Sequence, residues 1–239
     1  MTKRLFPIVR QPEDKRDHPL CLAPAKPIPA SIPPDFTIPI FDQGSTNTCA
    51  LNAGASALWV GKGKTGPVWS RAFLVWAVGI IERDHPEEDG VKTIRNVCKA
   101  LLHSGDCTEP AYPFTDADMH GTPPPVLVNA AKANIIKCYE ACVGLVAIKQ
   151  AIAAGRPVLA GIDCFAGIQS AKTAKTGIVP LPRKGEQSQG GHGILLLGYD
   201  AKRIWFVNSW SASWGSKGWG ILSNAYCQQY LFDAWSIIV

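Results

Sequence analysis

Residues 190–210 read GGHGILLLGYDAKRIWFVNSW and predict two β-strands joined by a tight turn. The apolar runs ILLLGY and IWFV are each long enough for a strand, and the polar residues DAKR between them are typical of a turn. If the pairing is centred on Ala201, His192 faces Trp210, and Asn208 lies one diagonal step away on the same face. A slip of one residue would put His192 and Asn208 on opposite faces, so this arrangement requires an odd-numbered turn.

A histidine and an asparagine that share a face can act together in catalysis. The asparagine oxygen accepts one imidazole N–H and fixes the tautomer, which leaves the other ring nitrogen free to pair with a thiolate. A lone histidine beside glycines is more often a hydrogen-bonded rim residue, so the interpretation of His192 depends on Asn208. Trp210 and Trp214 would shield this hydrogen bond from water, although they are equally ordinary as core tryptophans.

Cys49 is the cysteine that fits this pair, because a helix is expected to begin at or just before it. From Cys49 the sequence CALNAGASALWV is rich in helix formers, and residues 45–48 (STNT) are all potential caps. The unpaired N–H groups and the macrodipole of a helix N-terminus favour the anion and so lower the pKa of a thiol. Taken alone, Cys49 could equally be a small buried packing residue.

Helical patterns precede strand patterns along the chain. Helices are predicted over residues 70–83, 91–104 and 147–154, and strands over residues 157–162, 193–200, 203–210 and 234–239. This order predicts an α+β protein with two lobes, a mainly helical one over about 41–140 and an antiparallel β lobe over about 141–239. Residues 1–40 hold nine of the 19 prolines and predict an extended N-terminal arm laid across the body.

The composition indicates a folded protein and gives no sign of a nucleic-acid or membrane partner. Of the 239 residues 46% are apolar, and the net charge of +5 is scattered without a run of four basic residues. The most apolar stretch, residues 72–81, falls short of the roughly 20 residues that a spanning helix needs. Only residues 5–9 separate the first two arginines, so we expect no signal peptide and, by default, a cytoplasmic location.

The remaining cysteines leave their state open. Besides Cys49 the chain has seven cysteines, and most are expected to be buried thiols. Cys98 and Cys107 could form a local disulfide, which the sequence does not decide. Cys138 and Cys142 are spaced like metal ligands but have no matching pair nearby, so we predict neither a metal centre nor a cofactor.

These residues together resemble the papain family of cysteine peptidases. DQGSTNTCALNA (residues 42–53) looks like the family's Gln-Gly…Cys helix entry, and GGHGILLLGYD (residues 190–200) resembles its Gly-His-Ala-Val…Gly-Tyr strand. NSWSASWGSKGWG (residues 208–220) closely resembles its Asn-Ser-Trp…Trp-Gly block, and AYPF (residues 111–114) its Tyr-Pro-Tyr element. The resemblance covers residues 42–219 and implies a papain-like two-lobe fold with the active site in the cleft between the lobes.

The resemblance also implies roles for individual residues. Cys49 attacks the scissile carbonyl, His192 moves the proton, Asn208 orients His192, and the Gln43 side-chain amide holds the oxyanion together with the Cys49 N–H. Three glycines are expected to bind an extended polypeptide substrate: Gly90, Gly191 and Gly161. The small size of Gly161 would leave room for a bulky apolar side chain, and the first two could equally be turn residues.

The sequence departs from the family pattern near the nucleophile. Thr46 replaces the first cysteine of the usual Cys-Gly-Ser-Cys-Trp, Leu51 stands two after Cys49 in place of the usual serine-tryptophan pair, and Gly193 follows the histidine where alanine is common. We therefore expect no counterpart of the usual disulfides, and we expect no long helical propeptide, because only 48 residues precede Cys49. This pattern is similar to bacterial, archaeal or viral members of the family.

A cysteine endopeptidase is the leading interpretation of function. The same triad could instead pass the acyl group to an amine, or the chain could be a catalytically silent binding protein, although such a protein would tolerate loss of Cys49 or His192. The arm of residues 1–40 is a possible self-inhibitor that lies beside the cleft, and a proteinaceous inhibitor is the other expected partner. Alternatively the arm packs on the back of the lobes, and deletion of residues 1–30 would separate these two hypotheses.

Overall fold

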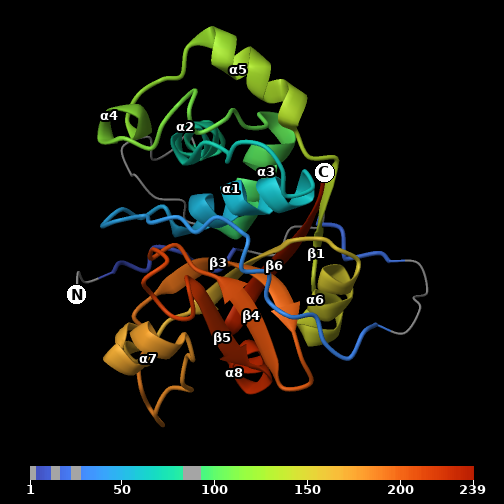
Figure 1. Cartoon of the computed structure of the whole chain (residues 1–239), viewed down its shortest axis with the longest axis vertical. Helices are drawn as coiled ribbons and strands as arrows, with labels where there is room; N and C mark the ends of the chain where they lie inside the picture. Colours follow the sequence, from blue (N-terminus) through green and yellow to red (C-terminus); the bar gives the residue numbers. More distant parts are fainter. Residues whose placement is uncertain (1–3, 12–16, 23–27, 83–92) are drawn as a thin grey trace.

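The computed structural model describes residues 4–11, 17–22, 28–82 and 93–239 (Figure 1). The first half of the chain forms α1 (Cys49–Gly61), α2 (Arg71–Ile81), α3 (Ile94–His103), α4 (Asp116–Met119), α5 (Pro125–Ala131) and the 3-10 turn η1 (Lys132–Asn134). The second half forms β1 (Cys138–Ala141), α6 (Gly144–Ala153), β2 (Val158–Asp163), η2 (Ala166–Gln169), α7 (Ala171–Thr176), β3 (Gly191–Tyr199), β4 (Arg203–Val207), β5 (Trp219–Ser223), α8 (Asn224–Tyr230) and β6 (Leu231–Ile238).

Helices α1–α5 gather on one side of the molecule, and the sheet with α6, α7 and α8 forms the other side (Figure 1). The strands lie in the order β1-β6-β2-β3-β4-β5, and every pair within this sheet is antiparallel. The predicted α+β fold with a helical lobe and an antiparallel β lobe is therefore confirmed. The residue boundaries that the sequence suggested for the arm and the lobes stay a prediction.

Helix α1 is the central element of the helical lobe. Every residue from Cys49 to Val60 is buried, because α1 lies between the sheet and helices α2 and α3. The helix begins at Cys49, as predicted, with Thr48 at the cap position. The Thr48 side chain makes no capping bond to α1, and its hydroxyl instead contacts Thr46 and Asn52.

Near the site the β3–β4 hairpin has the register that the sequence predicts, although its turn differs from the predicted one. Leu195 pairs with Val207, which is the register centred on Ala201. At the tip, Tyr199 pairs with Ile204, so the turn itself is an even-numbered one and the predicted odd-numbered turn is wrong. A β-bulge between Leu196 and Gly198 adds one residue to β3 and restores the predicted register.

The other predicted elements are found with shifted ends. Ser70 caps α2 by accepting a hydrogen bond from the Phe73 N–H, and Thr93 caps α3 in the same way. Residues 83–92 lie outside the described part of the chain, so the predicted ends of these two helices there are not placed. The strands β1 and β5 and the helices α4, α5, α7 and α8 were not predicted from the sequence. None of these elements is longer than seven residues, and β1 has only four.

Parts of the N-terminal arm add to the sheet. The Leu20 N–H donates to the Ala141 carbonyl at 2.8 Å, and the Ala141 N–H donates to His18 at 2.7 Å, so this piece lies along the edge strand β1. Ile32 exchanges two backbone hydrogen bonds of 2.8 Å with Tyr199 at the end of β3. In the described residues no helix is both long and apolar enough to span a bilayer.

Candidate active site

Cys49 is the first residue of α1, and its thiol lies against strand β3. The Gly193 N–H donates to Sγ at 3.3 Å, and the sulfur belongs to a residue with no exposed surface. Burial raises the pKa of the Cys49 thiol to about 11, against the lowering effect of hydrogen bonds from the Gly193 and Ala50 backbones. In this state, desolvation changes the pKa of the thiol more than the helix N-terminus does, and so the neutral thiol is favoured.

His192 and Asn208 meet as the hairpin register predicts. The His192 Nε2 lies 2.9 Å from the Asn208 Oδ1, which also accepts the Ser209 N–H at 2.8 Å. Because Oδ1 is the acceptor in both bonds, Nε2 carries a proton and Nδ1 is the nitrogen free to receive one. Nδ1 is buried and has no hydrogen-bond partner among the described residues.

The His192 ring is neutral in this environment. Burial lowers the pKa of His192 to about 4, while the bond to Asn208 acts in the opposite direction and the nearby charge of Arg4 lowers it further. Trp210 lies beside the ring, with centroids 4.8 Å apart, and Trp214 meets Trp210 edge-on at 5.3 Å. The two indoles lie where the sequence analysis expected a shield for the His192–Asn208 bond.

Gln43 is fixed by the segment that follows Asn208. Its Oε1 accepts the Ser209 hydroxyl at 2.7 Å, and its backbone N–H donates to the Ser209 carbonyl at 2.9 Å. The Nε2 donates one N–H to the Thr46 carbonyl at 2.8 Å and retains a second N–H for another acceptor. The Cys49 N–H, at the start of α1, has no acceptor within the helix, so it is a second available donor.

Gly193 explains one departure from the family pattern. A Cβ at this position would lie 2.7 Å from the Ala50 Cα and 2.8 Å from the Ala50 nitrogen. The start of α1 therefore approaches β3 so closely that alanine would not fit without a backbone shift. This close approach also brings the Gly193 N–H to the sulfur of Cys49.

The N-terminal residues 4–10, which we call the covering segment, lie over these groups. The Ile8 N–H donates to the Gly191 carbonyl at 3.0 Å, and the Ile8 side chain is only 3% exposed. The Phe6 ring meets the His192 ring edge-on with centroids 6.1 Å apart and lies 6.2 Å from the Trp210 ring. Cys49 has no exposed surface, so a substrate does not reach the thiol in this state.

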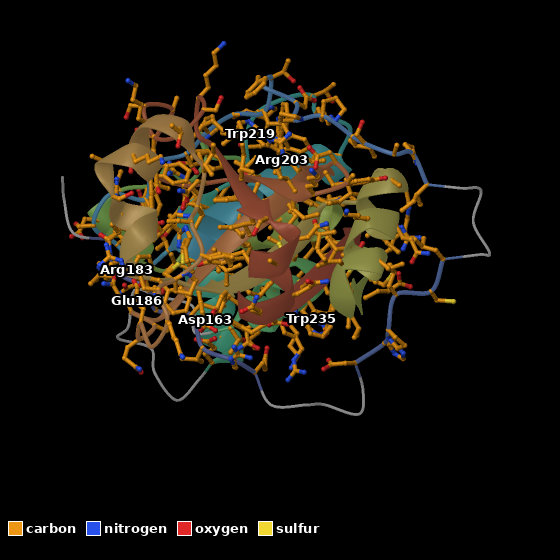
Figure 2. The ribbon with its side chains drawn as sticks, turned by 90° about the horizontal axis from the view of Figure 1, so that it is seen from below. Asp163, Arg183, Glu186, Arg203, Trp219 and Trp235 are labelled. Carbon is orange, nitrogen blue, oxygen red and sulfur yellow. The ribbon has the colours of Figure 1, made fainter. Side chains whose placement is uncertain are left out.

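Both ends of the covering segment are held by arginines. The Arg4 guanidinium donates to the Gly44 carbonyl, lies 3.4 Å from the Asp42 carboxylate and stands 5.9 Å from the Trp210 ring centre. At the other end Arg10 contacts the Asp163 carboxylate at 2.7 Å, and Figure 2 shows Asp163 beside the N-terminal chain.

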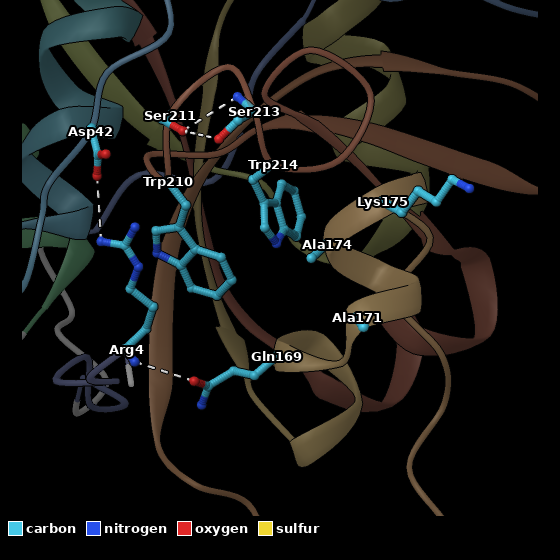
Figure 3. A pocket seen from close by; sticks show the side chains of 10 residues that line it. All are labelled: Arg4, Asp42, Gln169, Ala171, Ala174, Lys175, Trp210, Ser211, Ser213 and Trp214. Carbon is cyan, nitrogen blue, oxygen red and sulfur yellow. Dashed lines mark hydrogen bonds and ion pairs between the residues drawn. The ribbon is translucent and has the colours of Figure 1, made fainter. Parts of the chain in front are cut away.

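A pocket of about 480 Å³ opens between Arg4, the two indoles of Trp210 and Trp214, and helix α7 (Figure 3). The indoles of Trp210 and Trp214 lie between Arg4 and helix α7, and the Arg4 N–H donates to Gln169 at 3.2 Å. Lys175 and two serines of the loop after Trp210 complete its polar lining. The pocket has the size of a site for one or two side chains, and Arg4 occupies its edge.

The predicted substrate-binding glycines have different outcomes. Gly191 offers its carbonyl to Ile8, so it makes a backbone contact with an extended chain, here the protein's own. At Gly161 a Cβ would lie 2.7 Å from the Phe232 ring, so the open room expected there is wrong because Phe232 fills it. Gly90 lies outside the described residues. The substrate-binding roles of all three stay predictions.

All eight cysteines are free, so the possible Cys98–Cys107 disulfide is not formed. Among the described residues no group of three or more His, Cys, Asp or Glu side chains is placed to hold a metal ion. The sequence analysis did not anticipate Ser209, which anchors Gln43, although it directly follows Asn208 in the quoted motif. It also did not anticipate that Phe6 and Ile8 reach His192 and Gly191, because that contact joins distant parts of the chain.

Comparison with known proteins agrees with this geometry. The model of the papain family cysteine proteases matches residues 92–231, more than half of the chain and including His192 and Asn208. The chain belongs to the papain family. A peptidase C1-like protein of Acanthamoeba polyphaga mimivirus, described as uncharacterized, is 28% identical over 213 residues, which span 82% of this chain and 68% of the viral protein.

Solved structures extend the similarity to the segment that holds Cys49 and Gln43. Xylellain, a cysteine protease from Xylella fastidiosa, superposes with a TM-score of 0.86 at 25% identity and covers 100% of this chain and 98% of its own. Digestive procathepsin L 3 of Tenebrio molitor has the same fold, with a TM-score of 0.71 at 17% identity over 98% of this chain and 76% of its own. A viral and a bacterial relative fit the branch that the sequence analysis expected for this papain-family member.

Proposed function

We propose that this papain-family protein is a cysteine-type endopeptidase that cleaves extended polypeptides through a thioester at Cys49. The observation that carries the proposal is that the β3–β4 hairpin and the residues after it connect three groups: a thiol at a helix start, an imidazole bonded to Asn208, and the Gln43 amide. Cys49 contacts the residue next to His192, and Gln43 is held by the residue next to Asn208. These are the nucleophile, base, orienting group and oxyanion donors that acyl transfer requires.

The proposed reaction follows from these positions once the covering segment has left. The His192 Nδ1 takes the thiol proton, Sγ attacks the carbonyl carbon, and the oxyanion is stabilised by the Cys49 N–H and the free Gln43 N–H. The C–N bond then breaks as His192 returns the proton to the leaving amine. Water hydrolyses the thioester with His192 again as base, and Asn208 keeps Nε2–H bonded throughout.

We further propose that the covering segment is the inhibitor of this site. It packs Phe6 against His192, binds the Gly191 carbonyl through the Ile8 N–H, and adds to the burial that disfavours charge on His192. The Arg4 cation adds to this effect, since it lowers the pKa of His192. This proposal combines the two hypotheses for the arm. Residues 18–20 and Ile32 lie along the sheet, as a structural support would, and residues 4–10 lie over the site, as an inhibitor would.

Labelling with an epoxysuccinyl peptide inhibitor tests the proposed function. We expect one adduct by intact mass, mapped to Cys49, and its loss in Cys49→Ala. Cys21 is an exposed free thiol and so provides the matched control, since Cys21→Ser should leave labelling unchanged. Labelling of Cys21 alone would contradict the proposal, as would a chain that stays unlabelled and hydrolyses no peptide even when Ile8→Ala loosens the covering segment. Release of product carboxylate in water, and not of an amide when an amine is added, separates hydrolysis from acyl transfer.

A further inference from the structure

The oxyanion donor Gln43 sits on a segment without a covalent anchor. Its side chain is held by Thr46 and Ser209, but the loop around it turns sharply at Gly44, where φ is +60°. No disulfide ties this loop to the rest of the helical lobe, because all cysteines of the chain are free. Something else must keep the loop in one conformation if the donor is to be preorganised.

Arg71, the first residue of α2, contacts this loop directly. Its Nη1 donates to the Asp42 carbonyl at 3.2 Å, one residue before Gln43, and its guanidinium carbon lies 4.5 Å from the Phe41 ring centre. The same guanidinium carbon lies 4.1 Å from the Phe114 ring centre. The side chain is only 13% exposed, so these contacts are largely shielded from water.

The guanidinium is itself fixed by a paired carboxylate. Glu109 accepts Arg71 Nη2 at 2.6 Å and also accepts the backbone N–H of Arg71 at 3.0 Å. Its Oε1 takes the Phe114 N–H at 3.2 Å as well. The Arg71 guanidinium is planar and carries five donors, so its contacts to Glu109 and to the two aromatic rings favour one position. A lysine would not reproduce that position.

A second connection runs from Arg71 to Gln43 through buried side chains. Arg71 Nη1 donates to Asn52 Oδ1 at 3.3 Å, and Asn52 Nδ2 donates to the Thr48 hydroxyl at 3.0 Å. The Thr48 and Thr46 hydroxyls are 2.7 Å apart, and the Thr46 hydroxyl donates to the Gln43 carbonyl at 2.7 Å. Each hydroxyl can donate in the same direction, so the bonds form one polarised chain from the cation to Gln43.

We infer that Arg71 is a positioning residue for the oxyanion hole: it fixes the loop of residues 41–48 so that the free Gln43 N–H points at the developing charge. The inference rests on the proposed function, and it adds a residue that does not touch the substrate. It predicts a defect confined to steps that place charge on the carbonyl oxygen. Reactions of Cys49 that form no oxyanion should be unaffected.

The test compares two reactions of the same thiol in the full-length chain. Hydrolysis of a fluorogenic peptide amide needs the oxyanion hole, whereas alkylation of Cys49 by iodoacetamide needs only an accessible thiolate. Dividing the first rate by the second removes any change in how often the covering segment opens. For Arg71→Met we expect kcat to fall about 10- to 100-fold, less than loss of a donor itself, with KM and the alkylation rate each within about threefold of wild type.

Two further variants separate positioning from simple stability. Arg71→Lys keeps the charge beside Glu109 but cannot bond Asp42 and Asn52 together, so kcat should still fall although the melting temperature stays near wild type. The matched control is Arg156→Met, which breaks the 2.7 Å Arg156–Glu140 ion pair of similar burial in the β lobe. It should lower the melting temperature without changing the ratio of the two rates.

A double-mutant cycle gives the decisive outcome. In a Gln43→Ala background, Arg71→Met should lower kcat by less than about threefold, because the donor that it positions is already gone. Equal losses in both backgrounds, or an unchanged kcat in Arg71→Lys and Arg71→Met, would overturn the inference while leaving the proposed function intact. A wild-type chain that is alkylated at Cys49 but cleaves no peptide would overturn the proposed function and this inference with it.

Discussion

Ile8 is the side chain by which the covering segment should hold its place over the active site. It is 3% exposed, whereas its neighbour Val9 is 50% exposed and Leu5 is 47% exposed. The two arginine contacts at the ends of the segment are partly open to solvent, with Arg10 63% exposed, and exposed ion pairs contribute about 1 kcal/mol or less. The buried isoleucine is therefore the strongest single contact that a substitution can remove.

The expected size of the effect follows from this burial. Ile8→Ala removes three carbon atoms, and at about 0.8 kcal/mol per buried methylene the closed state loses about 2 kcal/mol relative to the open state. Since 1.4 kcal/mol corresponds to a factor of ten, the ratio of open to closed molecules should rise roughly 30-fold. While the closed state still predominates, the alkylation rate of Cys49 and kcat/KM should both rise by that factor.

The assay follows both rates in full-length wild type, Ile8→Ala and Val9→Ala at one pH and ionic strength. Val9→Ala trims a half-exposed side chain of the same segment and should change either rate by less than about twofold. Higher salt should raise the wild-type rates modestly, because it screens the Arg4–Asp42 and Arg10–Asp163 pairs. A lower melting temperature for Ile8→Ala without faster alkylation would refute the reasoning and make the segment a purely structural support.

Three further predictions test the site, one on the triad, one on pH and one on Gly193. Cys49→Ala and His192→Ala should each abolish peptide hydrolysis in a folded protein, and Asn208→Ala should lower kcat less, as stopped assays and circular dichroism would show. Acidification from pH 6.5 to about 4 should open the covering segment, because the pKa of His192 is lowered to about 4 when it is covered and the open state binds the proton more tightly. Faster amide hydrogen exchange at Ile8 would report this opening, and the same acid-induced opening in His192→Gln would disprove the role of His192. Gly193→Ala should destabilise the fold by about 1 to 3 kcal/mol in urea titrations, whereas Gly79→Ala, where a Cβ meets open space, should not destabilise it.

The sequence predicted those parts of the site that depend on local pattern. The start of α1 at Cys49 follows from helix formers after a run of capping residues, and the shared face of His192 and Asn208 follows from the hairpin. The register near the site was predicted although the turn was not, because the bulge between Leu196 and Gly198 offsets the even-numbered turn. Short elements such as β1 lack enough residues to show a period, and they were missed.

Contacts between distant parts of the chain could not be predicted in the same way. The Phe232 ring over Gly161 and Ile8 at Gly191 are set by how separate segments pack, and no local spacing encodes them. Arg71 illustrates the same limit. In the sequence it is one arginine at the start of a predicted helix, and only the fold brings it to Asp42 and Asn52.

The β-bulge at Leu197 has a consequence for how this hairpin tolerates insertions and deletions. It lies between the tip and the catalytic end of β3, so a change of one residue at the tip can be absorbed there without rotating the residues beyond it. Deleting Leu197 itself would remove the bulge but leave Leu196 opposite Phe206 and Leu195 opposite Val207, so His192 would stay on the face that it shares with Asn208. Related chains should therefore keep the pairing at the catalytic end of this hairpin whether or not this single extra residue is present.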